Sequence, residues 1–270
     1  MKTFVLIGVL LAVTSAVLGD PLQRGNRIYN GQAASPGQFP YAVGIAPITP
    51  ITARQVCGGS LVSANFVLTA GRCVHNIERV NVVLGALRIF EETEPTRLQM
   101  ESNQFIIHSG FEQEPDIFDV ALVRLPQAAP IGGNIGIIRL PNRRQVEATF
   151  VGQQGTVIGW GTSGTGTTFA DQLQFARSQV ISQLACRINL PATTILDEHV
   201  CTEGSSSPCA GDYGGPLTIT DIDGTTTQIG VFSFNSVVGC AQGRAAVYTR
   251  MSSYLNWIGQ NSDVVIRDDF

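Results

Sequence analysis

Short runs of β-branched and other apolar residues recur along the chain, separated by turn-forming clusters rich in Gly, Ser and Thr. Many short strands at close spacing are typical of an antiparallel sandwich or barrel. With 270 residues, 29 of them Gly, the chain suits one large all-β unit or two small domains. One helix is expected near the end, capped by Ser252 or Ser253. The expected strands are 66–69, 80–84, 105–107, 120–123, 156–158, 229–232 and 247–249.

Charged residues are scarce, at 14% of the chain against about 25% in ordinary soluble domains. Acidic residues outnumber basic ones by 21 to 17, which gives a net charge of -4. This balance excludes a disordered tail and a basic nucleic-acid binder. Lys2 is the single lysine, so every other basic residue is arginine.

The N-terminus has the order of a secretory signal. Lys2 precedes an apolar run from Phe4 to Leu18, which ends in small residues before Asp20. The run is short for a membrane span, so a signal anchor is the weaker alternative. We expect residues 1–19 to be a signal peptide, and the mature protein to be secreted and free of the membrane.

Six cysteines in a secreted chain indicate three disulfides, although the sequence alone leaves about 15 pairings open. No metal-ligand cluster of convincing spacing is found, and we expect neither a metal nor a cofactor. The acidic stretch from Glu91 to Glu94 could bind calcium, but such a run is more often a solvated loop.

Four short segments carry most of the functional information: RIYNG at 27–31, CGGSL at 57–61 with LTAGRC at 68–73, DVAL at 119–122 and GDYGGP at 211–216. In this order and spacing they resemble the chymotrypsin/trypsin family of serine proteases, and look most like its insect chymotrypsin and brachyurin branch. The resemblance covers Arg27 to Ile258. It implies an all-β fold of two packed six-stranded antiparallel β-barrels with a short C-terminal helix and the active site in the cleft between the barrels.

The same resemblance implies a domain organisation. A pro-segment at 20–27 would precede a trypsin-like domain at 28–258, with the first barrel at about 28–135, the second at about 136–250, and a tail at 259–270. The family's disulfide pattern would join Cys57 to Cys73, Cys186 to Cys201, and Cys209 to Cys240.

Two of the three positions of the implied catalytic triad carry unsuitable side chains. Arg72 stands where the family has the histidine base, and a guanidinium has no acceptor for a proton. Tyr213 stands where the family has the serine nucleophile, and its phenol has an ordinary pKa near 10. Asp119 is retained, so the triad is degenerate and no catalytic residue is assigned.

The chain has three histidines, His75, His108 and His199, which we expect to be surface or loop residues. Rescue of the base by His75 is the weaker alternative, because a base must lie within hydrogen-bond reach of its nucleophile. Asp119 should be buried and therefore needs a partner. We predict an ion pair from Arg72 to Asp119; the alternative is an Arg72 that points into solvent.

The Arg27–Ile28 bond resembles the family's zymogen cleavage site, and Asp212 matches the aspartate that receives the freed ammonium. Either this switch controls binding or it is a relic. The specificity pocket maps onto Ser207 at its base with Asn235 and Ala246 on its walls, which predicts a narrowed or plugged pocket. Backbone N–H groups of Gly211 and Tyr213 could still form an oxyanion-type nest, although the phenol can obstruct it.

These features predict a secreted, non-catalytic serine protease homologue that binds a protein partner, either an active protease or a protease substrate. The alternative is a weak or unconventional serine endopeptidase with a digestive role. A monomer that does not bind nucleic acid is expected.

Composition also bears on habitat. Removal of residues 1–27 leaves 14 arginines, no lysine and 20 acidic residues, a net charge of -6. Arginine keeps its charge in strongly alkaline fluid, where lysine loses it above roughly pH 10. Two explanations fit this composition equally well: adaptation to an alkaline insect gut lumen, and compositional drift.

Overall fold

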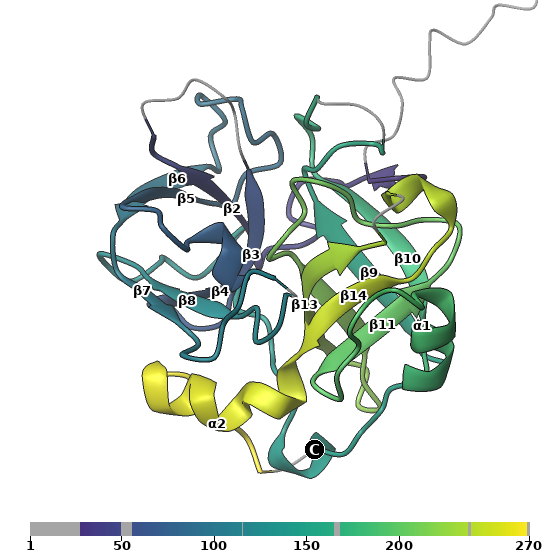
Figure 1. Ribbon diagram of the computed structural model, residues 1–270. Helices are drawn as coiled ribbons and strands as arrows, with labels where there is room; N and C mark the ends of the chain where they lie inside the picture. The colour runs from purple at the N-terminus through teal and green to yellow at the C-terminus, as the bar shows by residue number, and fades with distance from the viewer. Residues whose placement is uncertain (1–27, 50–55, 115, 165–167, 237–238, 269–270) are drawn as a thin grey trace, which may run out of the picture.

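A computed structural model describes residues 28–49, 56–114, 116–164, 168–236 and 239–268. The expected signal peptide and pro-segment, with Arg27, lie outside the described residues. The chain forms two seven-stranded sheets that lie side by side (Figure 1). The predicted all-β fold of the trypsin type is confirmed.

The first sheet is a curled half-barrel whose strands follow the order β6-β5-β2-β3-β4-β8-β7, and neighbouring strands pair antiparallel. The alternation of side chains along a strand divides each strand between two cores. On β4, Val67 packs inside this sheet, while Leu68 packs in the core that it shares with the second sheet. The strands are β2 (Ala42–Pro47), β3 (Cys57–Leu61), β4 (Phe66–Thr69), β5 (Val80–Leu84), β6 (Leu98–Ser102), β7 (Phe105–Ile107) and β8 (Ala121–Arg124).

The second sheet closes on itself because β9 pairs with both β10 and β12, which makes a six-stranded barrel. The short strand β1 pairs antiparallel with β10 of the second sheet. Its residues were expected in the first barrel, at about 28–135, but they belong to the second sheet. The strands are β1 (Gln32–Ala33), β9 (Gln154–Gly159), β10 (Gln174–Ile181), β11 (His199–Glu203), β12 (Pro216–Thr220), β13 (Thr226–Asn235) and β14 (Ala246–Arg250).

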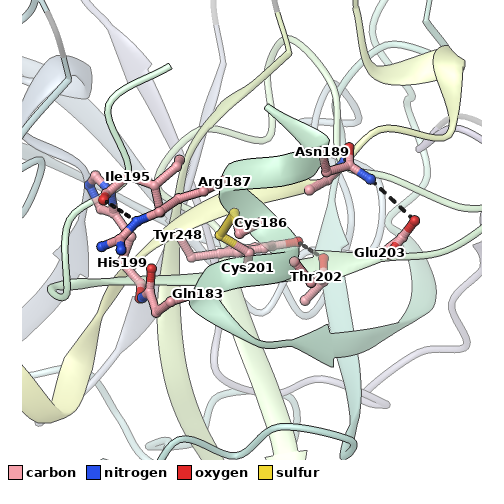
Figure 2. Close-up of a disulfide and its surroundings, with 12 residues drawn as sticks. Gln183, Cys186, Arg187, Asn189, Ile195, His199, Cys201, Thr202, Glu203 and Tyr248 are labelled. Atoms are coloured by element: carbon pink, nitrogen blue, oxygen red, sulfur yellow. Dashed lines mark hydrogen bonds between the residues drawn. A yellow bond between two sulfur atoms is a disulfide. The ribbon is translucent and has the colours of Figure 1, made fainter. Parts of the chain in front are cut away.

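The three disulfides join the cysteines that the family resemblance implied: Cys57 with Cys73, Cys186 with Cys201, and Cys209 with Cys240. The first ties β3 to the short 3₁₀ helix η1 (Gly71–Cys73). The second fixes helix α1 (Gln183–Asn189) to β11 (Figure 2). The third links the loop before Asp212 to η3 (Cys240–Gln242).

The C-terminal helix α2 (Met251–Asn261) is present, but its predicted cap was wrong. Arg250 is the N-cap residue and its side chain makes no capping hydrogen bond, while the Ser252 hydroxyl donates to the Val146 carbonyl. Helix α2 lies in yellow below the first sheet (Figure 1). Helix α1 was not predicted; Ser182 caps it by accepting from the Ala185 N–H. No described helix is long and apolar enough to cross a membrane.

Candidate functional site

Asp119 is the centre of the candidate site, and it lies where the two sheets meet. It precedes β8 of the first sheet and is fully buried. Its Oδ2 accepts a 2.6 Å hydrogen bond from the hydroxyl of Ser233, which belongs to β13 of the second sheet. The Asp119 carbonyl accepts a further bond from Thr249 on β14. These contacts hold the carboxylate at the junction of the two barrels.

Arg72 supplies the charge that Asp119 needs, so the predicted ion pair is confirmed. The Arg72 backbone N–H donates to Oδ1 and the side-chain Nε donates to Oδ2, each over 2.9 Å. The Nη2 atom pairs with the Asp116 carboxylate. Burial raises the pKa of Asp116 to about 6, although the Arg72 charge acts to lower it. One guanidinium therefore joins two carboxylates.

Tyr213 also contacts the Arg72 guanidinium. The Arg72 Cζ atom is 5.0 Å from the centre of the phenol ring, within cation–π range. The Tyr213 ring also stacks on the Phe232 ring, with centroids 5.4 Å apart and planes at 3°. Burial raises the pKa of the Tyr213 hydroxyl, so the phenolate is disfavoured. The two substituted triad positions are thus packed against each other.

The histidines have other neighbours. His75 packs edge-on against Phe111, and His108 stacks on Phe118. His199 was expected on the surface or in a loop, but it begins β11 and is only 1% exposed. Its Nδ1 accepts from the Leu196 N–H, and burial lowers its pKa to about 4. Among the described residues, no hydrogen bond joins a histidine side chain to Asp119 or Tyr213.

The expected oxyanion-type nest borders a cavity of about 290 Å³, which Arg72, Phe169, Gly211 and Tyr213 help to line. Gly211 has a φ of 95°. A Cβ atom there would lie 2.4 Å from the Phe169 ring, so glycine is required for both backbone and space. The Tyr213 carbonyl accepts from the Gly58 N–H over 2.7 Å, which anchors this turn to β3.

The residues that map to the specificity pocket lie together. Ser207 and Ala246 are buried, and Asn235 ends β13. The Asn235 side-chain amide donates a 2.5 Å hydrogen bond to the Pro208 carbonyl. This bond ties the end of β13 to the segment that carries Ser207, which supports the predicted narrowing of the pocket.

Ile28 and Asp212 are both buried. Tyr29 pairs with Ser207 through two backbone hydrogen bonds, which holds the residues after the Arg27–Ile28 bond in place. The Asp212 carboxylate accepts from the Gly161 N–H over 2.7 Å and from the Cys209 N–H over 2.9 Å. Burial nevertheless raises the pKa of Asp212 to about 7. The carboxyl group has no cationic partner among the described residues.

Comparison with known proteins identifies the family. The family model described as Trypsin matches residues 28–258. The chain belongs to the trypsin family. Collagenase of Hypoderma lineatum is 35% identical over 98% of this chain and 100% of its own length. Chymotrypsin of Phaedon cochleariae is 31% identical over 87% of this chain and 82% of its own. A solved structure of "HL collagenase" is 34% identical with a TM-score of 0.79, and the match covers 88% of this chain and 100% of that one.

Several neighbours of the trypsin-family site were missed from the sequence. Asp116 sits three residues before Asp119, but its contact with Arg72 depends on a turn in which Asp116 and Phe118 have positive φ. The role of Ser233 depends on the approach of the second sheet. The charge of Asp116 and its position near Asp119 were the only local signals available.

The acidic stretch weighed as a calcium site is used internally. The Glu94 carboxylate accepts from the Leu87 and Arg88 N–H groups at 2.9 Å, and Glu91 accepts from Thr93. Within the described ranges, no three potential metal ligands gather into one group.

Proposed function

We propose that this trypsin-family protein is secreted and binds proteins without cleaving them. The observation that carries the proposal is the Arg72 guanidinium, which is bonded through Nε to Asp119 at 2.9 Å. Acyl transfer in this family needs a neutral base between that carboxylate and the nucleophile. A guanidinium is protonated throughout the physiological pH range and has no acceptor, so it cannot take a proton from Tyr213.

Tyr213 adds a second obstacle to catalysis. Its ring is held between Arg72 and Phe232, and its pKa is raised, so the reactive phenolate is rarer than in water. Loss of one triad member typically costs several orders of magnitude in rate, and little remains beyond binding and oxyanion stabilisation. The hydrogen bond from the Asn235 side chain to the Pro208 carbonyl supports a narrowed pocket for the substrate side chain.

In contrast to the catalytic groups, the contacts that fix the loops around the cavity are present. The three disulfides, the Ser233 to Asp119 bond and the buried Asp212 hold the loops around the cavity at Gly211. The proposed partner is an active protease or a protease substrate. The proposed location is extracellular, where disulfides persist, and the absence of lysine from the chain after residue 27 fits an alkaline gut lumen.

A fluorophosphonate probe tests the proposal, because the activated hydroxyl of a working serine hydrolase attacks its phosphorus, displaces fluoride and becomes phosphonylated. The chain should be cleaved after Arg27, incubated with the probe and weighed by mass spectrometry. We expect no adduct on the unaltered protein and one adduct on the double variant Arg72→His with Tyr213→Ser. A stoichiometric adduct on Tyr213 or on another cleft residue of the unaltered protein would support the alternative of an unconventional endopeptidase.

A pull-down from the native secretion tests the binding half of the proposal. The cleaved chain and an uncleavable Arg27→Gln chain serve as paired baits. Recovery of a protease or its substrate by the cleaved form alone would assign control of binding to the Arg27–Ile28 switch. Equal recovery by both baits would make that switch a relic.

A further inference from the structure

A second cavity lies away from Arg72 and Tyr213, and it has a volume of about 480 Å³. Helix α2 contributes Tyr254 and Trp257 to its lining, and the end of β14 contributes Arg250. The start of α1 contributes Gln183. This pocket uses no residue of the degenerate triad, and the family resemblance assigned no role to it.

One wall of the pocket is aromatic. His108 stacks on Phe118 with ring centres 5.1 Å apart and planes at 12°. Tyr254 meets the His108 ring edge-on at 5.4 Å, and Trp257 lies at 5.5 Å. The His108 Nδ1 accepts from the Gly110 N–H, and burial lowers the pKa of His108, so this imidazole is neutral near pH 7. The wall therefore presents π faces and edges without a positive charge.

The rest of the pocket is acidic, with lining carboxylates from Glu147, Asp197 and Glu198. Within the described part of the chain, Glu147 and Glu198 form no ion pair, and Asp197 is 91% exposed with a 3.3 Å contact to Arg187. Arg250 is the one cation in the lining, but its Nε and Nη2 donate to the His199 carbonyl at 3.3 and 3.0 Å. Three carboxylates against one cation favour a positively charged ligand.

Two polar groups in the lining have no hydrogen-bond partner among the residues that the structure describes. The Tyr254 side chain is buried, with 4% exposure of the residue, and its hydroxyl makes no hydrogen bond. The Gln183 amide nitrogen donates to the His199 carbonyl, which leaves its buried Oε1 without a donor (Figure 2). A buried polar group without a partner is energetically unfavourable. A ligand with several N–H donors would satisfy both oxygens.

We propose that this pocket binds the guanidinium group of an arginine side chain from a protein partner. Guanidinium combines a permanent positive charge with five N–H donors and a plane that stacks on aromatic rings. Those properties match the three carboxylates, the two unpartnered oxygens and the aromatic wall. The lysine ammonium carries the charge but cannot stack as a plane. The site acts independently of any chemistry at Tyr213.

The probe is Nα-acetyl-L-arginine amide, titrated into the full secreted chain at pH 7. Binding is followed by fluorescence, because the chain has two tryptophans, and Trp160 is buried while Trp257 lines the pocket. We expect a saturable change that Trp257→Phe abolishes. The matching citrulline amide, which keeps the shape of arginine without its charge, should not bind. The matching lysine amide should bind at least threefold more weakly.

Two variants test the groups that carry the proposal. Glu198→Gln and Tyr254→Phe should each weaken binding by about three- to tenfold. Glu203→Gln makes the same charge change on β11 outside the pocket and should leave binding unchanged. Because Tyr254→Phe removes a buried hydroxyl without a partner, its melting temperature should be equal or higher, so weaker binding cannot come from misfolding.

The proposal is overturned by the absence of a saturable change up to about 10 mM probe. It is equally overturned if the citrulline or lysine amide binds as tightly as the arginine amide, or if Glu198→Gln and Tyr254→Phe bind it normally. None of these results alters the fluorophosphonate experiment, which reports on Tyr213 alone.

Discussion

At the scale of single residues, Arg72 determines the chemistry of the site. It forms ion pairs with Asp116 and Asp119 at the position where the family resemblance places the histidine base. The same side chain contacts the phenol at the nucleophile position. The two positions are therefore in direct contact, and a single reversion at either position would remove the contact between the guanidinium and the phenol.

Arg72→Ala should lower the free energy of unfolding by about 3 kcal/mol, because it leaves the fully buried Asp119 without a counter-charge. Urea denaturation measures this loss. Arg79→Ala is the matched control, since Arg79 pairs with Glu101 on the surface, where both side chains are about half exposed. That variant should change stability by less than about 1 kcal/mol. Equal losses in the two variants would show that the Arg72 to Asp119 pair has no special role.

At the scale of elements, the sequence predicted the positions of strands better than it predicted which strands pair with each other. The bounds of β4, β5 and β7 agree with the expected ranges, because β-branched runs between turn residues identify strands locally. Helix α1 was missed because its seven residues are too short to show a helical period, and only the Ser182 cap marks its start. The pairing of β1 with β10 joins residues more than 140 positions apart, which no local pattern reveals.

The candidate site was likewise predictable from the sequence only in part. The motif residues Arg72, Asp119 and Tyr213 were identified from spacing and family resemblance. The ion pair between Arg72 and Asp119 was predicted from their charges, together with the burial of Asp119 and the adjacent positions that the family resemblance implied. The Phe232 stack and the Asp116 contact depend on side-chain directions in the folded chain, so they could not be predicted.

The N-terminal segment gives an element-scale prediction about pH. In the uncleaved chain the raised pKa of Asp212 contributes stability that is present below pH 4 and is lost as pH rises to about 7. An Ile28 ammonium that reaches Asp212 after cleavage would lower the pKa of Asp212, so the cleaved chain would not lose this stability as pH rises. The stability of the cleaved chain minus that of the Arg27→Gln chain should therefore grow by about 2 to 4 kcal/mol between pH 4 and 7.

Denaturant unfolding of both forms across this pH range measures the difference, and titrating groups other than Asp212 cancel in the comparison. A difference that stays flat from pH 4 to 7 would mean that the new N-terminus does not reach Asp212.

At the scale of the whole molecule, the chain has a shared core between two barrels and no lysine after residue 27. Its behaviour in alkali should be set by buried tyrosines instead of amines. Burial raises the pKa of Tyr41 to about 12 and also raises the pKa of Tyr248. An unfolded tyrosine ionises near pH 10, so these residues contribute stability that is lost only as pH rises above about 10.

The free energy of unfolding should therefore be nearly constant from pH 8 to about 9.5 and fall above pH 10. Tyrosinate absorbance near 295 nm should rise together with unfolding. A decline in the free energy of unfolding that begins near pH 8 would count against an adaptation to alkaline fluid.

The pre-steady-state burst of p-nitrophenyl acetate hydrolysis tests the central claim most directly, because this small ester does not require an open specificity pocket. The chain cleaved after Arg27 should release no burst of p-nitrophenol. The double variant Arg72→His with Tyr213→Ser, in which Asp119 and the Ser233 contact are retained, should release a burst approaching one equivalent. A burst of one equivalent from the unaltered chain, blocked by a fluorophosphonate, would contradict the account and establish a working nucleophile in this cleft.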